Sequence, residues 1–245
     1  MKKHIDDAIN IIKGLDINGC ITGSVMLDYF EGADIDVFVY DQASLNKVLF
    51  YMHYNSMFTI LEPMELHKFN DYINNGKSSL ESLGLLTIKF KYNLLIDVNI
   101  VYKKFNKDIF SVLSNFDMDI IAVGYDIKTK KTLNLRETTG MVGTFNSWNP
   151  SFYKNDFWSI KRLLRQWERV VKYTQRGYDL SLLTDKYIQI VEDVIKTDNV
   201  YKSEKGVKYH TDTIEQFETV LKLLNVWKRD LKMSKEEIMI LKTII

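Results

Sequence analysis

The segment 34–40 constrains the fold more than any other part of the chain, because it carries two aspartates at the start of an apolar run. Successive side chains of a β-strand point to opposite faces. Asp34 and Asp36 therefore share one face, while the isoleucine and valines that alternate with them share the other. The apolar face can enter a core, but two neighbouring carboxylates repel each other unless something positive lies between them. The pattern predicts a strand with a paired-carboxylate site.

Strand and helix patterns alternate over the first 140 residues of the chain. Helical spacing covers residues 3–14, 43–53 and 106–116, and Gly23 opens a further helix that runs to about residue 30. Apolar or alternating runs predict strands near 17–22, 34–40, 57–61, 85–92 and 94–102, with a hairpin over 119–135 that turns at about 128–130. This mixed order predicts an α+β domain, in which a mixed sheet is flanked by helices.

The second part of the chain has a different period. The segment 138–151 combines two glycines, a proline and several polar residues, which is typical of a boundary. From Phe152 onward, apolar residues recur at helical spacing, as in the stripe Ile160, Leu164, Trp167. We expect a catalytic domain at residues 1–140 and an all-helical domain at residues 150–245.

Composition and charge narrow the classes of protein. Apolar residues make up 46% of the 245, and the formal net charge is +1, so a surface for polyanions would have to be local. The single cysteine, Cys20, forbids an internal disulfide and is compatible with a reducing, cytoplasmic compartment, or the host cytoplasm if the chain is viral. No apolar run is long enough to span a membrane. The four histidines are scattered, without the spacing of metal ligands.

A Gly-Ser pair, Gly23-Ser24, precedes the two aspartates by about ten residues. It stands where a strand gives way to a helix, so backbone N–H groups there could bind phosphate oxygens. Gly23 permits close approach of the backbone, and the Ser24 hydroxyl could donate to a β- or γ-phosphate. The alternative is local structure alone, with Ser24 as an N-cap, Asp34 in a turn and Asp36 paired with a lysine.

Gly23-Ser24 followed by Asp34-Ile35-Asp36 and an apolar strand resembles the DNA polymerase β-like nucleotidyltransferase superfamily over roughly residues 15–102. The resemblance implies a third carboxylate on a later strand, and Asp97 is in a suitable run, 94–102. It also implies an Mg²⁺-dependent, or Mn²⁺-dependent, nucleotidyltransferase that takes a nucleoside triphosphate as substrate. Asp34, Asp36 and Asp97 would be the catalytic metal ligands.

This implied chemistry agrees with the residue types. Carboxylates two residues apart on a strand lie about 6–7 Å apart, and Mg²⁺ prefers oxygen ligands completed by waters and phosphates. Two cations there would stabilise the attacking and leaving oxygens of a displacement at phosphorus, with release of pyrophosphate. Asp97 would serve the attacking hydroxyl of the acceptor.

A basic helical stretch at 154–178 is the second distinctive feature. On a helical wheel its basic residues gather on one side, with Trp158 among them: Lys154, Lys161, Arg165, Arg169, Lys172 and Arg176. Lys161, Arg162, Arg165 and Trp158 are candidates for binding the triphosphate or an RNA or tRNA acceptor. The alternative is a solvated face that pairs with acidic neighbours.

Two other interpretations of the chain stay open. One is a toxin-type or defence-type nucleotidyltransferase that modifies tRNA or protein. The other is an inactive nucleotidyltransferase fold that binds a nucleotide or RNA. A rival Asp-x-Asp, Asp117 and Asp119, has no Gly-Ser pair at the right distance, and we interpret it as capping or turn chemistry. No Walker A loop and no Ser-His-Asp or Cys-His signature is present.

Overall fold

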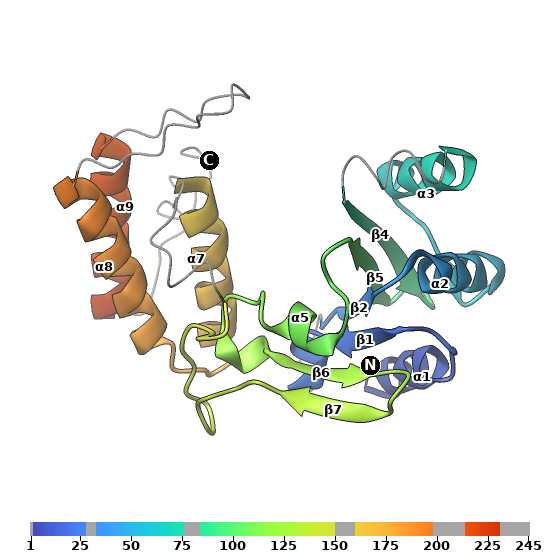
Figure 1. Cartoon of the computed structure of the whole chain (residues 1–245). Coiled ribbons are helices and arrows are strands. Elements are labelled where there is room, and N and C mark those ends of the chain that lie inside the picture. Colours follow the sequence, from blue (N-terminus) through green and yellow to red (C-terminus); the bar gives the residue numbers. More distant parts are fainter. Residues whose placement is uncertain (1, 28–32, 76–83, 150–159, 198–213, 231–245) are drawn as a thin grey trace. The chain divides into compact units, whose positions relative to one another are not determined.

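The computed structural model describes residues 2–27, 33–75, 84–149, 160–197 and 214–230 (Figure 1). The chain divides into two compact units. The first consists of Met1–Phe116 and Ile120–Arg136, and the second of Asp117–Asp119 and Glu137–Ile245. The first unit thus ends at Arg136. The sequence predicts that the first domain ends four residues later, at residue 140. The short piece Asp117–Asp119 belongs to the second unit, which the sequence did not indicate.

The first unit is built on a mixed seven-stranded sheet with the order β3-β4-β5-β2-β1-β6-β7. The strands are β1 (Gly19–Thr22), β2 (Ile35–Val39), β3 (Phe58–Thr59), β4 (Leu85–Tyr92), β5 (Ile96–Lys103), β6 (Val123–Asp126) and β7 (Lys131–Asn134). Only the central pair β2 and β5 is parallel, and the other neighbours are antiparallel. The α+β class and the mixed sheet flanked by helices are therefore as predicted.

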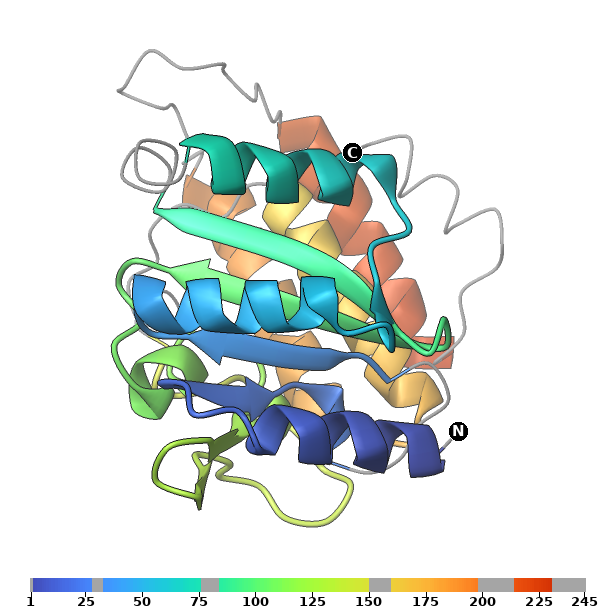
Figure 2. The ribbon, with the colours of Figure 1, turned by 90° about the vertical axis from the view of Figure 1, so that its right-hand side faces the viewer.

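Three helices cover one face of this sheet: α1 (Lys2–Lys13), α2 (Gln42–Tyr54) and α3 (Pro63–Asn75). Figure 2 shows them side by side along the strands. Ile5, Ala8 and Ile12 of α1 are buried in one core with Val37 and Val39 of β2. Burying such side chains stabilises the fold by about 1.5–3 kcal/mol each, so this face of β2 fixes the strand's register.

The opposite face of the sheet carries a smaller apolar cluster and the polar residues of interest. Cys20, Phe38, Val101 and Val112 pack together, with Val112 supplied by α5 (Ile109–Leu113). Cys20 is fully buried and is thus a core residue, as expected, and this burial raises the pKa of its thiol to about 12. Asp34 and Asp36 lie on this face, because they alternate with the core residues of β2.

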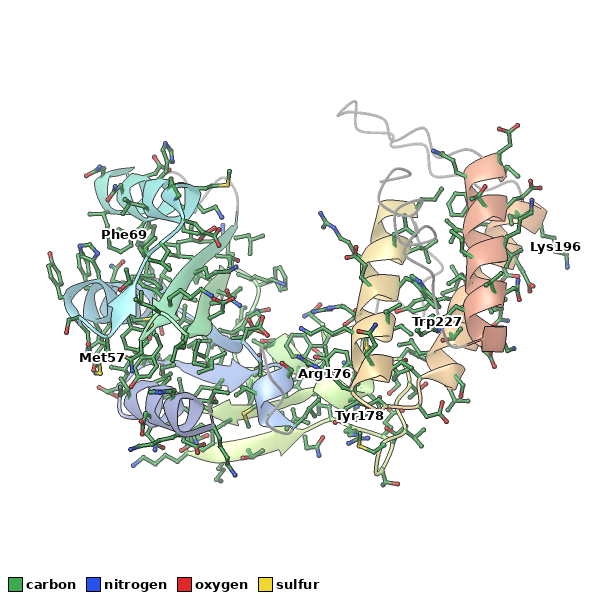
Figure 3. All side chains as sticks on the ribbon, turned by 180° about the vertical axis from the view of Figure 1, so that it is seen from behind. Met57, Phe69, Arg176, Tyr178, Lys196 and Trp227 are labelled. Carbon is green, nitrogen blue, oxygen red and sulfur yellow. The ribbon has the colours of Figure 1, made fainter. Side chains whose placement is uncertain are left out.

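The second unit contains the helices α7 (Ile160–Gln175), α8 (Ser181–Thr197) and α9 (Ile214–Asp230). Their apolar sides meet, and Trp167 of α7 contacts Trp227 of α9 edge to face, with ring centroids 5.2 Å apart. Figure 3 shows the side chains of these helices, with Trp227 labelled on α9 and Arg176 and Tyr178 near the end of α7. The helical periodicity beyond residue 152 is confirmed for the described parts of this unit.

Two elements differ from the sequence expectations. Residues 63–75, for which the sequence suggested no element, form α3; Pro63 is its first residue, a position where proline's missing N–H costs nothing. The helix expected from Gly23 to residue 30 is, in its described part, a single 3₁₀ turn, η1 (Ser24–Met26). The described turn by itself has no macrodipole to bind phosphate, and the rest of the expected helix, from residue 28, lies outside the described residues.

Candidate active site

A row of polar residues crosses the face of the sheet opposite to α1, α2 and α3. In the strand register Thr22 is opposite Asp36, Asp36 is opposite Asn99, and Asn99 is opposite Lys89. Residues opposite one another on neighbouring strands point to the same face. Four strands, β1, β2, β5 and β4, therefore bring these side chains together.

Asp34 and Asp36 converge on the amide of Asn99. The Nδ2 of Asn99 donates to Oδ1 of Asp36 at 2.8 Å and lies 3.4 Å from Oδ2 of Asp34. Because both oxygens contact one nitrogen, they lie no more than about 6 Å apart. Both aspartates are half-buried, so their repulsion is only partly screened by water. The donor stands between the two oxygens, where a cation would compensate both charges.

Asp97 lies on the same face, two residues before Asn99 on β5. It is directly opposite Lys91 of β4, and the Lys91 ammonium forms an ion pair with its Oδ1. About a third of each side chain is exposed. The third carboxylate implied by the family resemblance is thus on the same face as Asp34 and Asp36, and it is paired with a lysine.

Gly23 and Ser24 follow β1 directly beside Asp36. Gly23 has φ 89°, a region that side chains other than glycine rarely adopt, and a Cβ there would come within 2.6 Å of Oδ2 of Asp36. Ser24 is 3% exposed, and its hydroxyl has no hydrogen-bond partner among the described residues. Gly23, not Ser24, is at the N-cap of η1, and no side chain caps the turn. The alternative interpretation, in which Ser24 serves only as an N-cap, is therefore wrong on this point.

The chemistry of these side chains fits a hard divalent cation at Asp34 and Asp36. Carboxylate oxygens are the ligands that Mg²⁺ prefers, and one or two of them suffice when phosphates and waters complete the shell. Ser24, one residue after Gly23, has a buried hydroxyl without a hydrogen-bond partner among the described residues. Within the described residues, no group of three or more His, Cys, Asp or Glu side chains is arranged to hold a metal ion.

The basic helix is only partly described. Trp158 lies outside the described residues, as do the side chains of Lys161 and Arg162, although both positions are in α7. Arg165 and Lys172 are exposed. The Nη1 of Arg169 donates to Oδ1 of Asp117 at 2.7 Å, and Asp117 is 4% exposed. Arg169 thus pairs with an acidic neighbour, as in the alternative interpretation of the basic residues as a solvated face.

The rival pair, Asp117 and Asp119, serves the second unit's own structure. Asp119 is fully buried, and its two oxygens accept from the backbone N–H groups of Thr138 and Thr144 and from the Thr138 hydroxyl. Asp117 pairs with Arg169, and its carbonyl accepts from the N–H of Asn146. These contacts connect loop segments to η2 (Asp119–Ile121), which agrees with turn chemistry.

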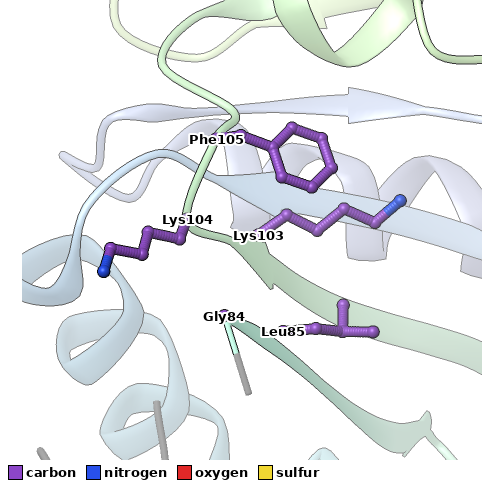
Figure 4. A pocket seen from close by; sticks show the side chains of 5 residues that line it. All are labelled: Gly84, Leu85, Lys103, Lys104 and Phe105. Carbon is purple, nitrogen blue, oxygen red and sulfur yellow. The ribbon is translucent and has the colours of Figure 1, made fainter. Parts of the chain in front are cut away.

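A pocket of about 610 Å³ opens at the far end of β4 and β5. Figure 4 shows its lining, which combines lysine and exposed apolar side chains: Gly84, Leu85, Lys103, Lys104 and Phe105. Lys103 is four residues beyond Asn99 on β5, about 13 Å along the strand. Its ammonium lies 5.8 Å from the ring centroids of Phe38 and of Phe105. The pocket is therefore on the carboxylate face but separate from the carboxylates.

Sequence reasoning missed three residues of this face: Thr22, Lys91 and Asn99. Asn99 and Lys91 contact the candidate carboxylates, and the Thr22 hydroxyl, opposite Asp36, is buried without a partner among the described residues. The period-2 pattern of residues 85–92 and 94–102 could have placed Asn99 and Lys91 on the face of Asp97, given the turn at Asn93. Thr22 had no comparable signal.

Comparison with models of protein families and with curated proteins finds no match for this chain. Among the described residues, no helix is long and apolar enough to cross a membrane.

Proposed function

We propose that this protein is a divalent-cation-dependent nucleotidyltransferase, which moves a nucleoside monophosphate from a nucleoside triphosphate to an acceptor hydroxyl. One observation carries the proposal. Asp34 and Asp36 converge on a single donor beside the Gly23-Ser24 turn, where a buried hydroxyl has no partner among the described residues. Paired carboxylates and an adjacent unused donor are what a cation with a triphosphate requires. The mixed sheet flanked by helices supports a polymerase β-like fold.

In this proposal each residue has a defined task. Asp34 and Asp36 hold Mg²⁺ or Mn²⁺, and the Ser24 hydroxyl donates to an oxygen of the β- or γ-phosphate. The lack of a side chain at Gly23 lets the phosphate approach the backbone beside Asp36. A bound cation would neutralise the charge that develops on the leaving pyrophosphate.

The reaction exchanges one bond at phosphorus for another. The acceptor oxygen forms a bond to the α-phosphorus, and the bond from that phosphorus to the bridging oxygen breaks, so pyrophosphate leaves with the electron pair. The proton of the hydroxyl passes to water or to the Asp97 carboxylate. The proposed acceptor is a hydroxyl of RNA, such as a tRNA 3′ end, and the exposed Arg165 and Lys172 of α7 are basic residues suited to a phosphate backbone.

Label transfer tests the proposal. The protein is incubated with Mg²⁺ and each α-labelled nucleoside triphosphate, with RNA, protein or small-molecule fractions of a lysate as separate acceptors. We expect transfer to RNA, and loss of at least a hundredfold with Asp36→Asn. Asp16→Asn, an exposed aspartate paired with Lys47, is the matched control and should transfer normally. A toxin-type or defence-type enzyme would label tRNA or protein. Transfer that survives Asp36→Asn would refute the assignment.

One observation favours a second candidate, an inactive nucleotidyltransferase fold that binds a nucleotide. The ion pair with Lys91 occupies Asp97, the carboxylate that would serve the attacking hydroxyl. In that case the protein would bind a nucleoside triphosphate with a divalent cation, and no fraction of the lysate would accept label. Binding and transfer measured on the same preparation separate the two candidates.

A further inference from the structure

Lys91 gives the carboxylate face a charge that the sequence alone did not assign to it. It is directly opposite Asp97 in the β4–β5 register, and its ammonium contacts the Asp97 carboxylate. Side chains opposite each other on antiparallel strands have Cβ atoms about 5 Å apart, so the Lys91 side chain reaches Asp97 directly. The lysine is therefore held at the carboxylate that a second cation would need.

The charges of the cluster decide how many cations it attracts. Asp34, Asp36 and Asp97 contribute three negative charges, and Lys91 removes one of them. A first divalent cation at Asp34 and Asp36 neutralises the remainder. A second divalent cation would then approach a cluster with no net charge and would also have to displace a tethered ammonium. Electrostatic attraction within a screening length of about 8–10 Å would not favour it.

We propose that Lys91 restricts this site to one divalent cation, by taking the position beside Asp97 that a second cation would occupy. This inference rests on the proposed function, because it assumes that Asp34 and Asp36 hold a cation. It departs from the two-cation arrangement that the sequence resemblance implies. It also gives Asp97 a different task, because a carboxylate paired with Lys91 can still accept a hydrogen bond from the acceptor hydroxyl.

A count of bound Mn²⁺ tests the inference without any measurement of activity. Free Mn²⁺ is measured by electron paramagnetic resonance during a titration of the full chain. Binding to the double variant Asp34→Asn, Asp36→Asn is subtracted to remove surface sites. We expect one Mn²⁺ per chain for the wild type and two for Lys91→Met, which keeps the aliphatic stem and removes the charge. Lys91→Arg should bind one, because it keeps the charge beside Asp97.

Lys89→Met is the matched control. Lys89 is on the same strand and the same face, two residues away, but its ammonium lies 3.5 Å from Glu62. The Lys89→Met variant should bind one Mn²⁺. A second Mn²⁺ in Lys91→Met would then not be explained by the loss of one positive charge alone. Two Mn²⁺ in the wild type, or one in a folded Lys91→Met, would overturn the inference and leave the proposed function standing. No Mn²⁺ at all in the wild type would overturn both.

Discussion

The Nδ2 of Asn99 lies 2.8 Å from Oδ1 of Asp36 and also contacts Asp34, so one amide compensates two carboxylates in the absence of a cation. The question posed by the paired aspartates thus has a structural answer. Their repulsion is reduced by a neutral donor from the neighbouring parallel strand. A neutral donor can turn away when a cation arrives, whereas a lysine in the same place would compete with it.

Asn99→Leu should therefore destabilise the protein most when no cation is present. Removing the shared donor takes one hydrogen bond from each of two half-buried carboxylates, which costs about 1–3 kcal/mol. Mn²⁺ should restore more stability in the variant than in the wild type, because it replaces the compensation that the Asn99 amide provided. Thermal unfolding with EDTA and with Mn²⁺ measures both effects. Asn46→Leu, which removes an exposed asparagine bonded to Tyr72, should not change the response to Mn²⁺. Equal responses in all three proteins would contradict this role.

Ser24→Ala should have opposite effects on stability and on binding. The buried hydroxyl has no partner among the described residues, so its removal should stabilise the nucleotide-free protein by about 1 kcal/mol. Affinity for a nucleoside triphosphate with Mg²⁺ should fall about tenfold, since one donor to the phosphates is lost. Urea unfolding and calorimetric titration measure the two effects.

Ser44→Ala provides the comparison for Ser24, because Ser44 is also buried but its hydroxyl accepts from the N–H of Asn18 at 2.8 Å. It should lower stability and leave nucleotide affinity unchanged. A Ser24→Ala protein that is less stable and binds nucleotide normally would show that Ser24 has a structural task only.

Gly23→Ala should disturb the site in two separable ways. The Gly23 backbone, with φ 89° and ψ −166°, is in a region that is essentially restricted to glycine and costs alanine about 1–3 kcal/mol, and the new Cβ would come within 2.6 Å of Oδ2 of Asp36. Gly140→Ala measures the cost of a positive φ without a contact, since Gly140 has φ +61° but nothing within 4 Å of an added Cβ. We expect Gly140→Ala to lose about 1 kcal/mol and Gly23→Ala clearly more, with weakened Mn²⁺ binding. Chemical unfolding and Mn²⁺ titration provide the data, and equal losses would argue against contact with Asp36.

Arg165 and Arg169 should behave differently, although the sequence grouped them on one basic face. Arg169→Glu places a carboxylate against the buried Asp117 and should cost about 2–4 kcal/mol. Arg165→Glu changes an exposed residue and should alter stability by less than about 0.5 kcal/mol, while weakening salt-dependent RNA binding. Urea unfolding and RNA binding at two salt concentrations separate them. If Arg165→Glu leaves RNA binding unchanged, Arg165 does not contact the acceptor.

The period-2 and helical patterns predicted most of the elements because burial of one face dictates them. The strand at β2, the β4–β5 pair with positive φ at Asn93, and the hairpin with its turn at Lys130 lie where the alternation placed them. In contrast, the sequence did not predict α3, because its apolar residues Met64 and Leu66 are on the exposed side and interrupt the helical period of the buried residues. Its buried Glu65 instead accepts from the backbone N–H of Lys89 on β4, a partner that no local pattern reveals.

The sequence indicated the carboxylates of the candidate site, but it did not indicate which side chains contact them. Alternation assigned Asp34 and Asp36 to one face, and the resemblance implied Asp97 on a later strand; the structure has all three on one face. Alternation could have placed Asn99 and Lys91 on this face, but which carboxylate each of them contacts depends on side-chain positions that the alternation does not give. Arg169 and Asp117 are 52 positions apart, so their ion pair arises only from the packing of the second unit.

The most direct test of the account is a crystal structure of the protein with Mn²⁺ and a non-hydrolysable nucleoside triphosphate. Anomalous scattering from Mn²⁺ should give a peak bound by Asp34 and Asp36, with a phosphate oxygen within hydrogen-bond distance of the Ser24 hydroxyl. The Asn99 amide should have turned its nitrogen away from that position. A structure at saturating Mn²⁺ and nucleotide with no peak there, and with Asn99 still donating to Asp36, would contradict the account.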